Sequence, residues 1–213
     1  MEPRTDNYRL SRERAQTYFL GFDQQAIIDA WALAHDRDYL YLTFLGEDYR
    51  VCRKTGAVTR CRDDREAGFE EALSIFDLLC HESPVKVPSG RFAPVNSLRG
   101  RPSAIGVGTD FHSKTAARFD RNREGFRRAC LHLGGTPMEL GDLGFSFPVF
   151  AGLTVRLKFY AADEEFPASA VLLWDENMLQ YVYYETVFYI AGFLLQSILV
   201  QMDAERKSQE EKI

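Results

Sequence analysis

Residues 39–60 read YLYLTFLGEDYRVCRKTGAVTR, and this stretch determines most of the fold prediction. Aromatic and other strand-favouring residues dominate Tyr39–Leu45, and Asp48–Arg53 alternates between polar and apolar side chains. A glycine-containing turn at Lys54–Gly56 then leads into Ala57–Arg60. We therefore predict a meander of three short antiparallel strands.

Helices are predicted on both sides of this meander. Apolar residues recur at helical spacing over Leu10–Leu20 and Asp23–Ala34, and Asp23 is suited to cap the second helix because its carboxylate can accept backbone N–H groups. After the meander, Glu66–His81 returns to helical spacing. A further helix is expected at Ser113–Leu133, where a pair of glycines ends the pattern.

The C-terminal half predicts a second set of strands and a closing helix. Apolar residues alternate over Leu143–Val149 and Val155–Phe159, and Ser169–Trp174 is a continuous apolar run typical of a central strand. The final helix, from about Tyr183 to Asp203, is apolar on nearly every side. Strands and helices do not alternate one for one, so we predict an α+β fold with a largely antiparallel sheet and about five helices.

Length and composition predict one globular domain over residues 1–213, with 204–213 as a charged C-terminal tail. No signal or transit peptide is recognisable at the N-terminus, so a cytoplasmic protein is expected. The apolar run Thr186–Val200 is shorter than the roughly 20 residues that span a bilayer, which favours a buried helix and no membrane. Its Phe188, Phe193, Leu195 and Leu199 lie outside a single stripe, so the helix is a candidate homodimer contact.

The four cysteines, at positions 52, 61, 80 and 130, are too scattered for a redox pair or a zinc knuckle. We predict free thiols, no metal site and no cofactor. The sequence also lacks a Walker motif, a nucleophile elbow and a complete dinucleotide fingerprint. The sequence therefore contains none of these motifs that would identify an enzyme, and it leaves open whether the protein is one.

Positive charge is concentrated between Pro84 and Leu133, which contain ten basic and three acidic residues in a chain of net charge −5. This segment includes a long irregular connection over Ser83–Thr109, a kind of loop that is often functional. An anionic small molecule or a protein partner is therefore expected, whereas nucleic acid is unlikely because the aromatic residues here fall on the core stripe. The alternative is a solvated helix face whose cations pair with carboxylates elsewhere. The candidate anion-binding residues are Arg99, Arg101, His112, Lys114, Arg118, Arg121 and Arg128.

A rival site is acidic. Asp163 and Glu165 lie in the turn between two predicted strands, and Asp175 ends the second strand. A metal-dependent or carboxylate-based enzyme would use these three side chains. If the strands form a hairpin, however, Asp175 lies at its far end, and the default expectation is a solvated turn with its charges paired to Arg156 and Lys158.

Four blocks of sequence carry a resemblance to a known family. These blocks are Leu45–Val51 with the turn at Lys54–Gly56, then Pro88–Arg91, then Gly134–Met138, and then Asp163–Pro167 with Leu172, Asp175 and Asn177. Together they resemble an uncharacterised prokaryotic family, the domain of unknown function 3786, over about residues 15–200. Some members of that family are joined to cysteine-rich iron-sulfur segments, which this chain lacks. The resemblance implies no activity and no catalytic residues.

Three functions remain open from the sequence. The favoured one is a cytoplasmic binding or accessory domain for an anionic small molecule or a protein partner, using the basic segment. The second is the carboxylate-based enzyme, and the third is a structural homodimer formed through the C-terminal helix.

Overall fold

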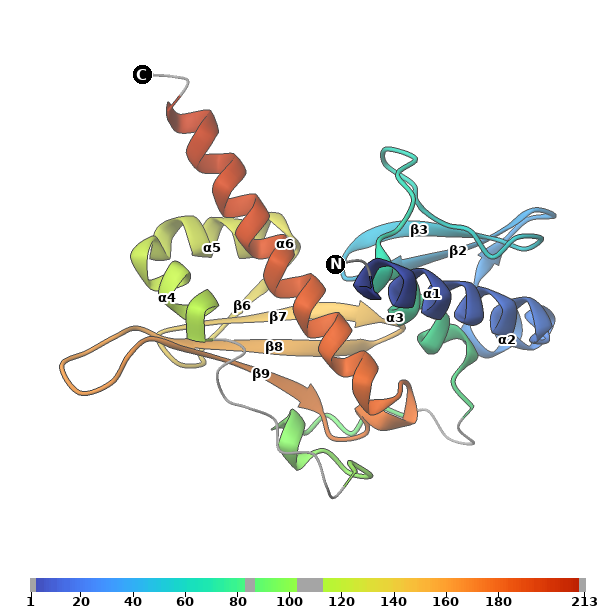
Figure 1. Cartoon of the computed structure of the whole chain (residues 1–213). Helices are drawn as coiled ribbons and strands as arrows, with labels where there is room; N and C mark the ends of the chain where they lie inside the picture. Colours follow the sequence, from blue (N-terminus) through green and yellow to red (C-terminus); the bar gives the residue numbers. More distant parts are fainter. Residues whose placement is uncertain (1–2, 83–86, 103–112, 211–213) are drawn as a thin grey trace. The chain divides into compact units, whose positions relative to one another are not determined.

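The computed structural model describes residues 3–82, 87–102 and 113–210, without the side chains of 3–6, 113, 209 and 210. Two compact units make up the chain. Unit 1 comprises Met1–Lys86 and Gln180–Ile190, and unit 2 comprises Val87–Leu179 and Ala191–Ile213. Figure 1 labels their helices and most of their strands. The described residues form six helices and two antiparallel sheets, which confirms the α+β prediction, whereas the single domain stays a prediction.

Unit 1 is a four-stranded sheet with helices, and its strand order is β1-β2-β3-β4. The predicted meander is confirmed: each strand pairs antiparallel with the next. Leu45 and Gly46 join β2 to β3 with positive φ at both positions, as a tight two-residue hairpin requires. The elements of this unit are α1 Pro3–Gly21, α2 Gln24–Trp31, β1 Ala34–His35, β2 Tyr39–Phe44, β3 Glu47–Cys52, β4 Val58–Arg60, α3 Phe69–Cys80 and the first turns of α6 Tyr184–Glu210.

The start of α2 is as predicted, but its end is not. The Asp23 carboxylate accepts the backbone N–H groups of Gln25 and Ala26, which confirms the cap. The helix ends at Trp31 because Ala32 adopts a left-handed conformation with φ of 49°. The prediction of helix through Ala34 is therefore wrong, and Ala34 pairs with Tyr41 in the short strand β1.

Unit 2 is a five-stranded antiparallel sheet of order β5-β9-β8-β7-β6. The three predicted strands form its centre, and the sequence missed the two edge strands because each is only three residues long and contains proline. Its elements are β5 Phe92–Pro94, the 3-10 turn η1 Val95–Ser97, α4 Ser113–Arg121, α5 Arg123–His132, β6 Thr136–Met138, β7 Leu143–Phe150, β8 Leu153–Tyr160, β9 Ser169–Asp175, the 3-10 turn η3 Met178–Gln180 at the unit boundary, and the rest of α6.

The helix predicted over Ser113–Leu133 is two helices. Asn122 interrupts it, and its side chain caps α5 by accepting the backbone N–H of Gly125. Phe119 and Phe126, on either side of the break, are stacked with ring centroids 4.2 Å apart, and Phe126 packs against Phe145 and Phe159 of the sheet. The helical pair therefore covers one face of β7 and β8.

Helix α6 continues to Glu210, so at least residues 204–210 of the predicted tail are helical. Its length and composition alone would allow it to cross a membrane, but the core helix of a soluble protein passes the same test, and 44% of its most apolar window is buried inside the chain. Leu195 and Leu199 are 4% and 8% exposed, so one chain already buries them. The homodimer contact stays a prediction, for which half-buried Phe188 and Phe193 are the remaining candidates.

Candidate functional site

Two of the candidate anion-binding residues form ion pairs with helix α6 of unit 2. Arg118 donates from Nη2 to both carboxylate oxygens of Asp203, at 2.7 and 2.9 Å. Arg128 donates from Nε to Glu205 at 3.0 Å. The alternative foreseen from the sequence, that basic residues pair with carboxylates elsewhere, therefore holds for these two side chains.

The same three helices also carry basic side chains that form no ion pair among the described residues. Asp120 of α4 pairs with Arg123 at the start of α5, and Glu124 pairs with Arg127 within α5, which uses the carboxylates of both helices. In the part of the chain that the structure describes, Lys114, Arg121 and Lys207 form no ion pair, and Arg121 donates only to a backbone carbonyl, that of Ala117.

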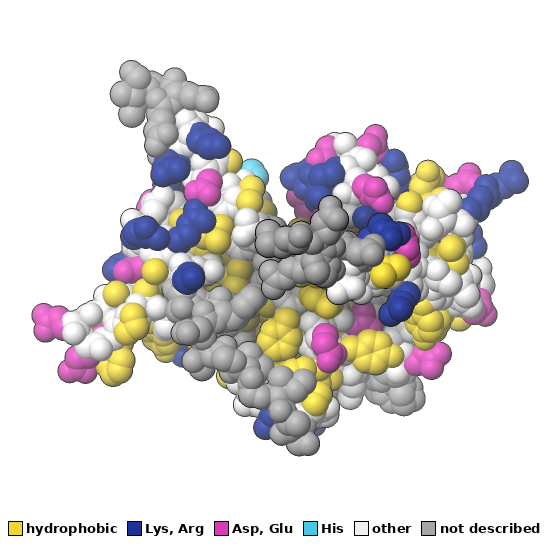
Figure 2. Space-filling view, in the orientation of Figure 1, with side chains coloured by type: hydrophobic (Ala, Val, Ile, Leu, Met, Phe, Trp, Pro, Cys, Tyr) yellow, Lys and Arg dark blue, Asp and Glu magenta, His cyan; other side chains and the backbone are white. Residues whose placement is uncertain are grey.

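Four of the seven candidate anion-binding residues lie on α4 and α5. Lys114, Arg118 and Arg121 recur at helical spacing along one side of α4. The hydrogen bond from Arg118, opposed by partial burial and supported by the charges of Arg206 and Lys207, lowers the pKa of the Asp203 carboxyl. Figure 2 shows the dark-blue side chains that extend over α4, α5 and the C-terminal half of α6. We call this surface the basic face; it consists of Lys114, Arg118, Arg121, Arg128, Arg206 and Lys207.

The remaining anion-binding candidates lie apart from the basic face or outside the described structure. Arg99 is exposed, and its guanidinium lies 3.3 Å from Glu176. Arg101 is exposed near the end of the described segment 87–102. His112 lies outside the described residues. The structure therefore groups three of the seven candidates on α4 and one on α5.

The acidic candidates are not brought together. Strands β8 and β9 pair from Tyr160 with Ser169 at the turn to Val155 with Trp174 at the far end. Asp163 and Glu165 lie in the turn that joins β8 to β9, whereas Asp175 lies at the opposite end of the hairpin, as predicted from the sequence. Within the described ranges, no group of three or more His, Cys, Asp or Glu residues is placed to bind a metal.

Asp163 folds back onto its own turn. Its Oδ1 accepts the backbone N–H groups of Glu165 and Phe166, at 2.9 and 2.7 Å, and these bonds lower the pKa of the carboxyl. The predicted ion pairs with the neighbouring strand are not the contacts observed. Lys158 lies over the ring of Tyr160, and Arg156 lies over the ring of Phe92.

Asp175 is buried and holds a loop. With 2% of its surface exposed, its carboxylate accepts the backbone N–H groups of Ser89, Gly90 and Asn177 at 2.8 to 2.9 Å. Asn177 also donates to the carbonyl of Val87. This arrangement joins two of the sequence blocks that carry the family resemblance, and it gives Asp175 a structural role.

A residue missed in the sequence lies beside Asp163. Asp142 accepts the backbone N–H of Ala161 and lines an open pocket of about 550 Å³ at the turn end of the β8–β9 hairpin. Asp142 is 21 residues from Asp163, and only the pairing of β7 with β8 brings it there. The other lining residues are Tyr160, Ala161, Phe166, Pro167 and Ser169.

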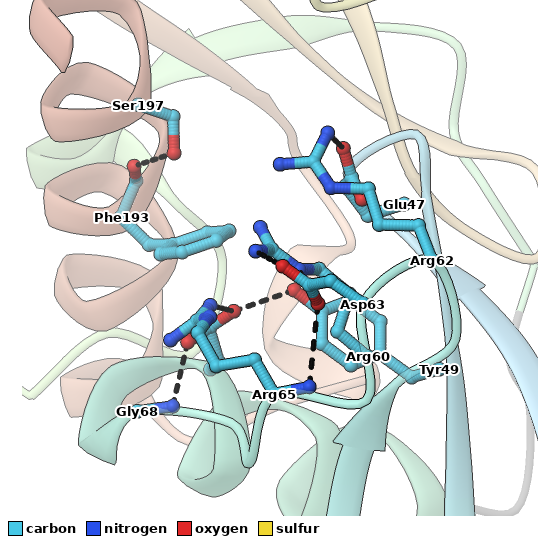
Figure 3. Close-up of polar contacts among 10 residues, drawn as sticks. Glu47, Tyr49, Arg60, Arg62, Asp63, Arg65, Gly68, Phe193 and Ser197 are labelled. Carbon is cyan, nitrogen blue, oxygen red and sulfur yellow. Dashed lines mark hydrogen bonds and ion pairs between the residues drawn. The ribbon is translucent and has the colours of Figure 1, made fainter.

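Unit 1 contains a buried carboxylate of its own, that of Glu71, which is 3% exposed. It accepts hydrogen bonds from the Tyr49 hydroxyl, the Arg65 guanidinium and the Gly68 backbone N–H, each at 2.6 Å. Figure 3 shows these three groups gathered around one carboxylate. Burial and the bond to Glu71 raise the pKa of the Tyr49 hydroxyl. The network caps α3 and fixes it to β3, so its role is structural.

An aromatic pocket of about 200 Å³ lies in unit 1, between α1, α3 and the first turns of α6. We call it the α1–α3 pocket. The pocket could not be predicted from the sequence, because Tyr18 and Tyr183 lie about 165 residues apart and a single tyrosine resembles an ordinary surface residue. Its lining residues are Ala15, Tyr18, Leu73, Phe76, Asp77, Cys80, Tyr183, Thr186 and Tyr189.

Comparison with known proteins gives one result. The sequence model of a family described as "Domain of unknown function (DUF3786)" matches residues 23–197. No curated protein and no solved structure matches the chain.

Proposed function

The chain belongs to the DUF3786 family, and we propose that it is a cytoplasmic binding or accessory domain whose basic face binds an anionic partner. One observation carries this proposal. On α4, α5 and the described end of α6, every carboxylate forms an ion pair with an arginine. Lys114, Arg121 and Lys207 form no ion pair among the described residues. Basic side chains that lie close together without carboxylate partners create a positive potential that attracts anions.

An acidic segment of a protein fits this surface better than a small anion. The cations are spread along three helices, and neither of the two pockets described above lies among them. A small ligand is usually held in a concave site, whereas an extended acidic chain can contact several exposed cations in turn. The proposed partner is therefore a protein with an acidic surface or tail.

Charge reversal on α4 tests the proposal. Lys114 and Arg121 are exposed, so the double variant K114E/R121E should fold, and its binding of a fluorescent oligoglutamate peptide should weaken by about tenfold or more. Fluorescence anisotropy at low salt measures the affinity. The matched control, R9E/R37E, makes the same charge change at exposed positions in unit 1 and should bind as the unmodified protein does.

Each other outcome contradicts part of the proposal. Equal weakening in both double variants would mean that net charge, not the basic face, attracts the peptide. Saturable binding of inorganic phosphate with no binding of oligoglutamate would replace the protein partner with a small anion. Tighter binding of single-stranded DNA than of oligoglutamate would make nucleic acid the partner.

A further inference from the structure

The α1–α3 pocket combines aromatic walls with negative charge. Tyr18, Phe76, Tyr183 and Tyr189 contribute rings, and Asp77 contributes a carboxylate. The described lining residues include no lysine or arginine. Aromatic faces carry partial negative charge, so rings and a carboxylate around one space attract a cation.

The charges around Tyr18 also favour a cation in the pocket. Burial and the negative charge of Glu82 raise the pKa of the Tyr18 hydroxyl, and the carboxylate of Asp77 acts in the same direction. A positively charged group near this ring would have the opposite effect. The mouth of the pocket is therefore electronegative, in contrast to the basic face of unit 2.

Asp77 is held firmly in place. Its Oδ2 accepts the backbone N–H of Tyr183 at 2.8 Å and the hydroxyl of Thr186 at 2.5 Å. Its Oδ1 lies 3.5 Å from Nδ1 of His81, whose ring also meets Tyr183 edge to face. These contacts fix the carboxylate and one of the rings together, which makes the pocket preformed.

We propose that the α1–α3 pocket binds a small organic ammonium ion. A volume of about 200 Å³ is below the roughly 300–1,000 Å³ of pockets for drug-sized ligands, so the guest is a substituted ammonium group rather than a nucleotide. Methylated ammonium groups lose little hydration on entering an aromatic site and gain cation–π contacts there. This site lies within unit 1 and is independent of the basic face.

The first test compares two probes of the same shape. Choline and its uncharged analogue 3,3-dimethylbutan-1-ol differ in the quaternary nitrogen, so a difference in their binding measures the effect of the charge. Titrations of both probes with the full-length protein in one buffer, followed by NMR, measure the two affinities. Choline should bind and shift the resonances of Tyr18 and Tyr183, whereas the alcohol should bind at least about fivefold more weakly.

Variants of the ring and of the charge provide the second test. Tyr18 is 54% exposed, so Y18L should fold; it removes one wall, and choline affinity should fall by about 2- to 30-fold. Y18F keeps the ring and should bind like the unmodified protein. E82Q removes the negative charge that has the largest effect on the Tyr18 hydroxyl, so choline should also bind this variant more weakly. Tyr8 is 51% exposed on the same helix but lies outside the pocket, so Y8L is the matched control.

Three results would overturn the proposal. Equal binding of choline and the alcohol would make this a site for neutral apolar groups. Absence of choline binding by the folded, full-length protein would remove the site. Equal loss of affinity in Y8L and Y18L would place the choline elsewhere on α1.

Discussion

The basic face and the α1–α3 pocket are opposites in both charge and shape. On the basic face, arginines outnumber carboxylates, and the cations without ion pairs among the described residues lie on the outside of helices. In the pocket, tyrosines surround the fixed carboxylate Asp77, and no cation is among the described lining residues. One surface therefore suits an extended anion and the other a small cation.

Net charge therefore says little about which ligand each surface attracts. The chain carries −5, yet α4 and α5 together contain six basic residues and two acidic ones. Exposed charges act mainly over a Debye length of about 10 Å at 0.1 M salt, so each surface attracts according to its own neighbours. The two surfaces should accept ligands of opposite charge without competing.

Loss of the Glu71 network is expected to have the largest effect. E71A leaves the buried Tyr49 hydroxyl and the Gly68 N–H without their acceptor, and should lower the free energy of unfolding of unit 1 by about 3–5 kcal/mol. Urea denaturation measures this loss. Choline binding should then disappear at urea concentrations where oligoglutamate still binds. E70A, on the preceding residue, is the control; simultaneous loss of both ligands would show that the two units unfold as one domain.

Asp175 should have the next largest effect, together with a pH dependence. Burial raises the pKa of its carboxyl, but the N–H groups of Ser89, Asn177 and Gly90 outweigh burial and leave the pKa lowered. Its stabilisation is therefore complete above the unfolded pKa of about 3.9 and is lost as the pH falls through the folded pKa.

Substitution D175N should accordingly cost about 1–3 kcal/mol in urea denaturation at pH 6, and the difference from the unmodified protein should shrink below about pH 4. D163N is the matched control, because Asp163 is exposed and bonds only within its own turn. Equal costs for the two substitutions would contradict the structural role given to Asp175.

Salt should separate the two ligands. Raising NaCl from 50 to 500 mM should weaken oligoglutamate binding by about tenfold or more, because exposed charges are screened. Choline binding should change by less than about threefold, since much of it comes from contact with rings. Titrations of both probes in the same buffers measure the contrast. A steep salt dependence for choline would mean that Glu82 and Asp77, rather than the rings, dominate the pocket.

The smallest expected effect concerns Asp203, the carboxylate within the basic face. D203N removes the partner of Arg118, so oligoglutamate should bind about two- to fivefold more tightly. Both side chains are 40% or more exposed, so the substitution should cost less than about 1 kcal/mol of stability. E139Q, at an exposed carboxylate in unit 2, is the control for net charge. Unchanged affinity in D203N would show that Arg118 is not part of the binding surface.

Much of the fold could be predicted because strand and helix signals in this chain are local. The meander, the three central strands of unit 2 and the Asp23 cap follow from alternation, turn residues and one carboxylate at a helix start. Local signals fail where elements are short or interrupted. Three-residue edge strands have no detectable period, and Asn122 breaks a helix whose apolar stripe continues on both sides.

The candidate sites were less predictable, because each depends on which partner a charge meets. The sequence identified Lys114, Arg118, Arg121 and Arg128 as a cationic group, but not that Asp203 and Glu205 pair with two of them. Similarly, nothing in the sequence distinguishes the burial of Asp163 from that of Asp175. One is exposed on its own turn, and the other is buried beneath a loop 85 residues earlier.

The α+β class, the antiparallel meander and the segregation of positive charge can be predicted from the sequence, because these features depend on near neighbours along the chain. The folded structure was needed to see which cations lack a carboxylate partner among the described residues, and to see that Tyr18, Asp77 and Tyr183 line one pocket. Their spacing along the chain carries no period that a pattern could reveal. The physical reason is that burial, ion pairing and cavity shape are set by residues that only folding brings within contact distance.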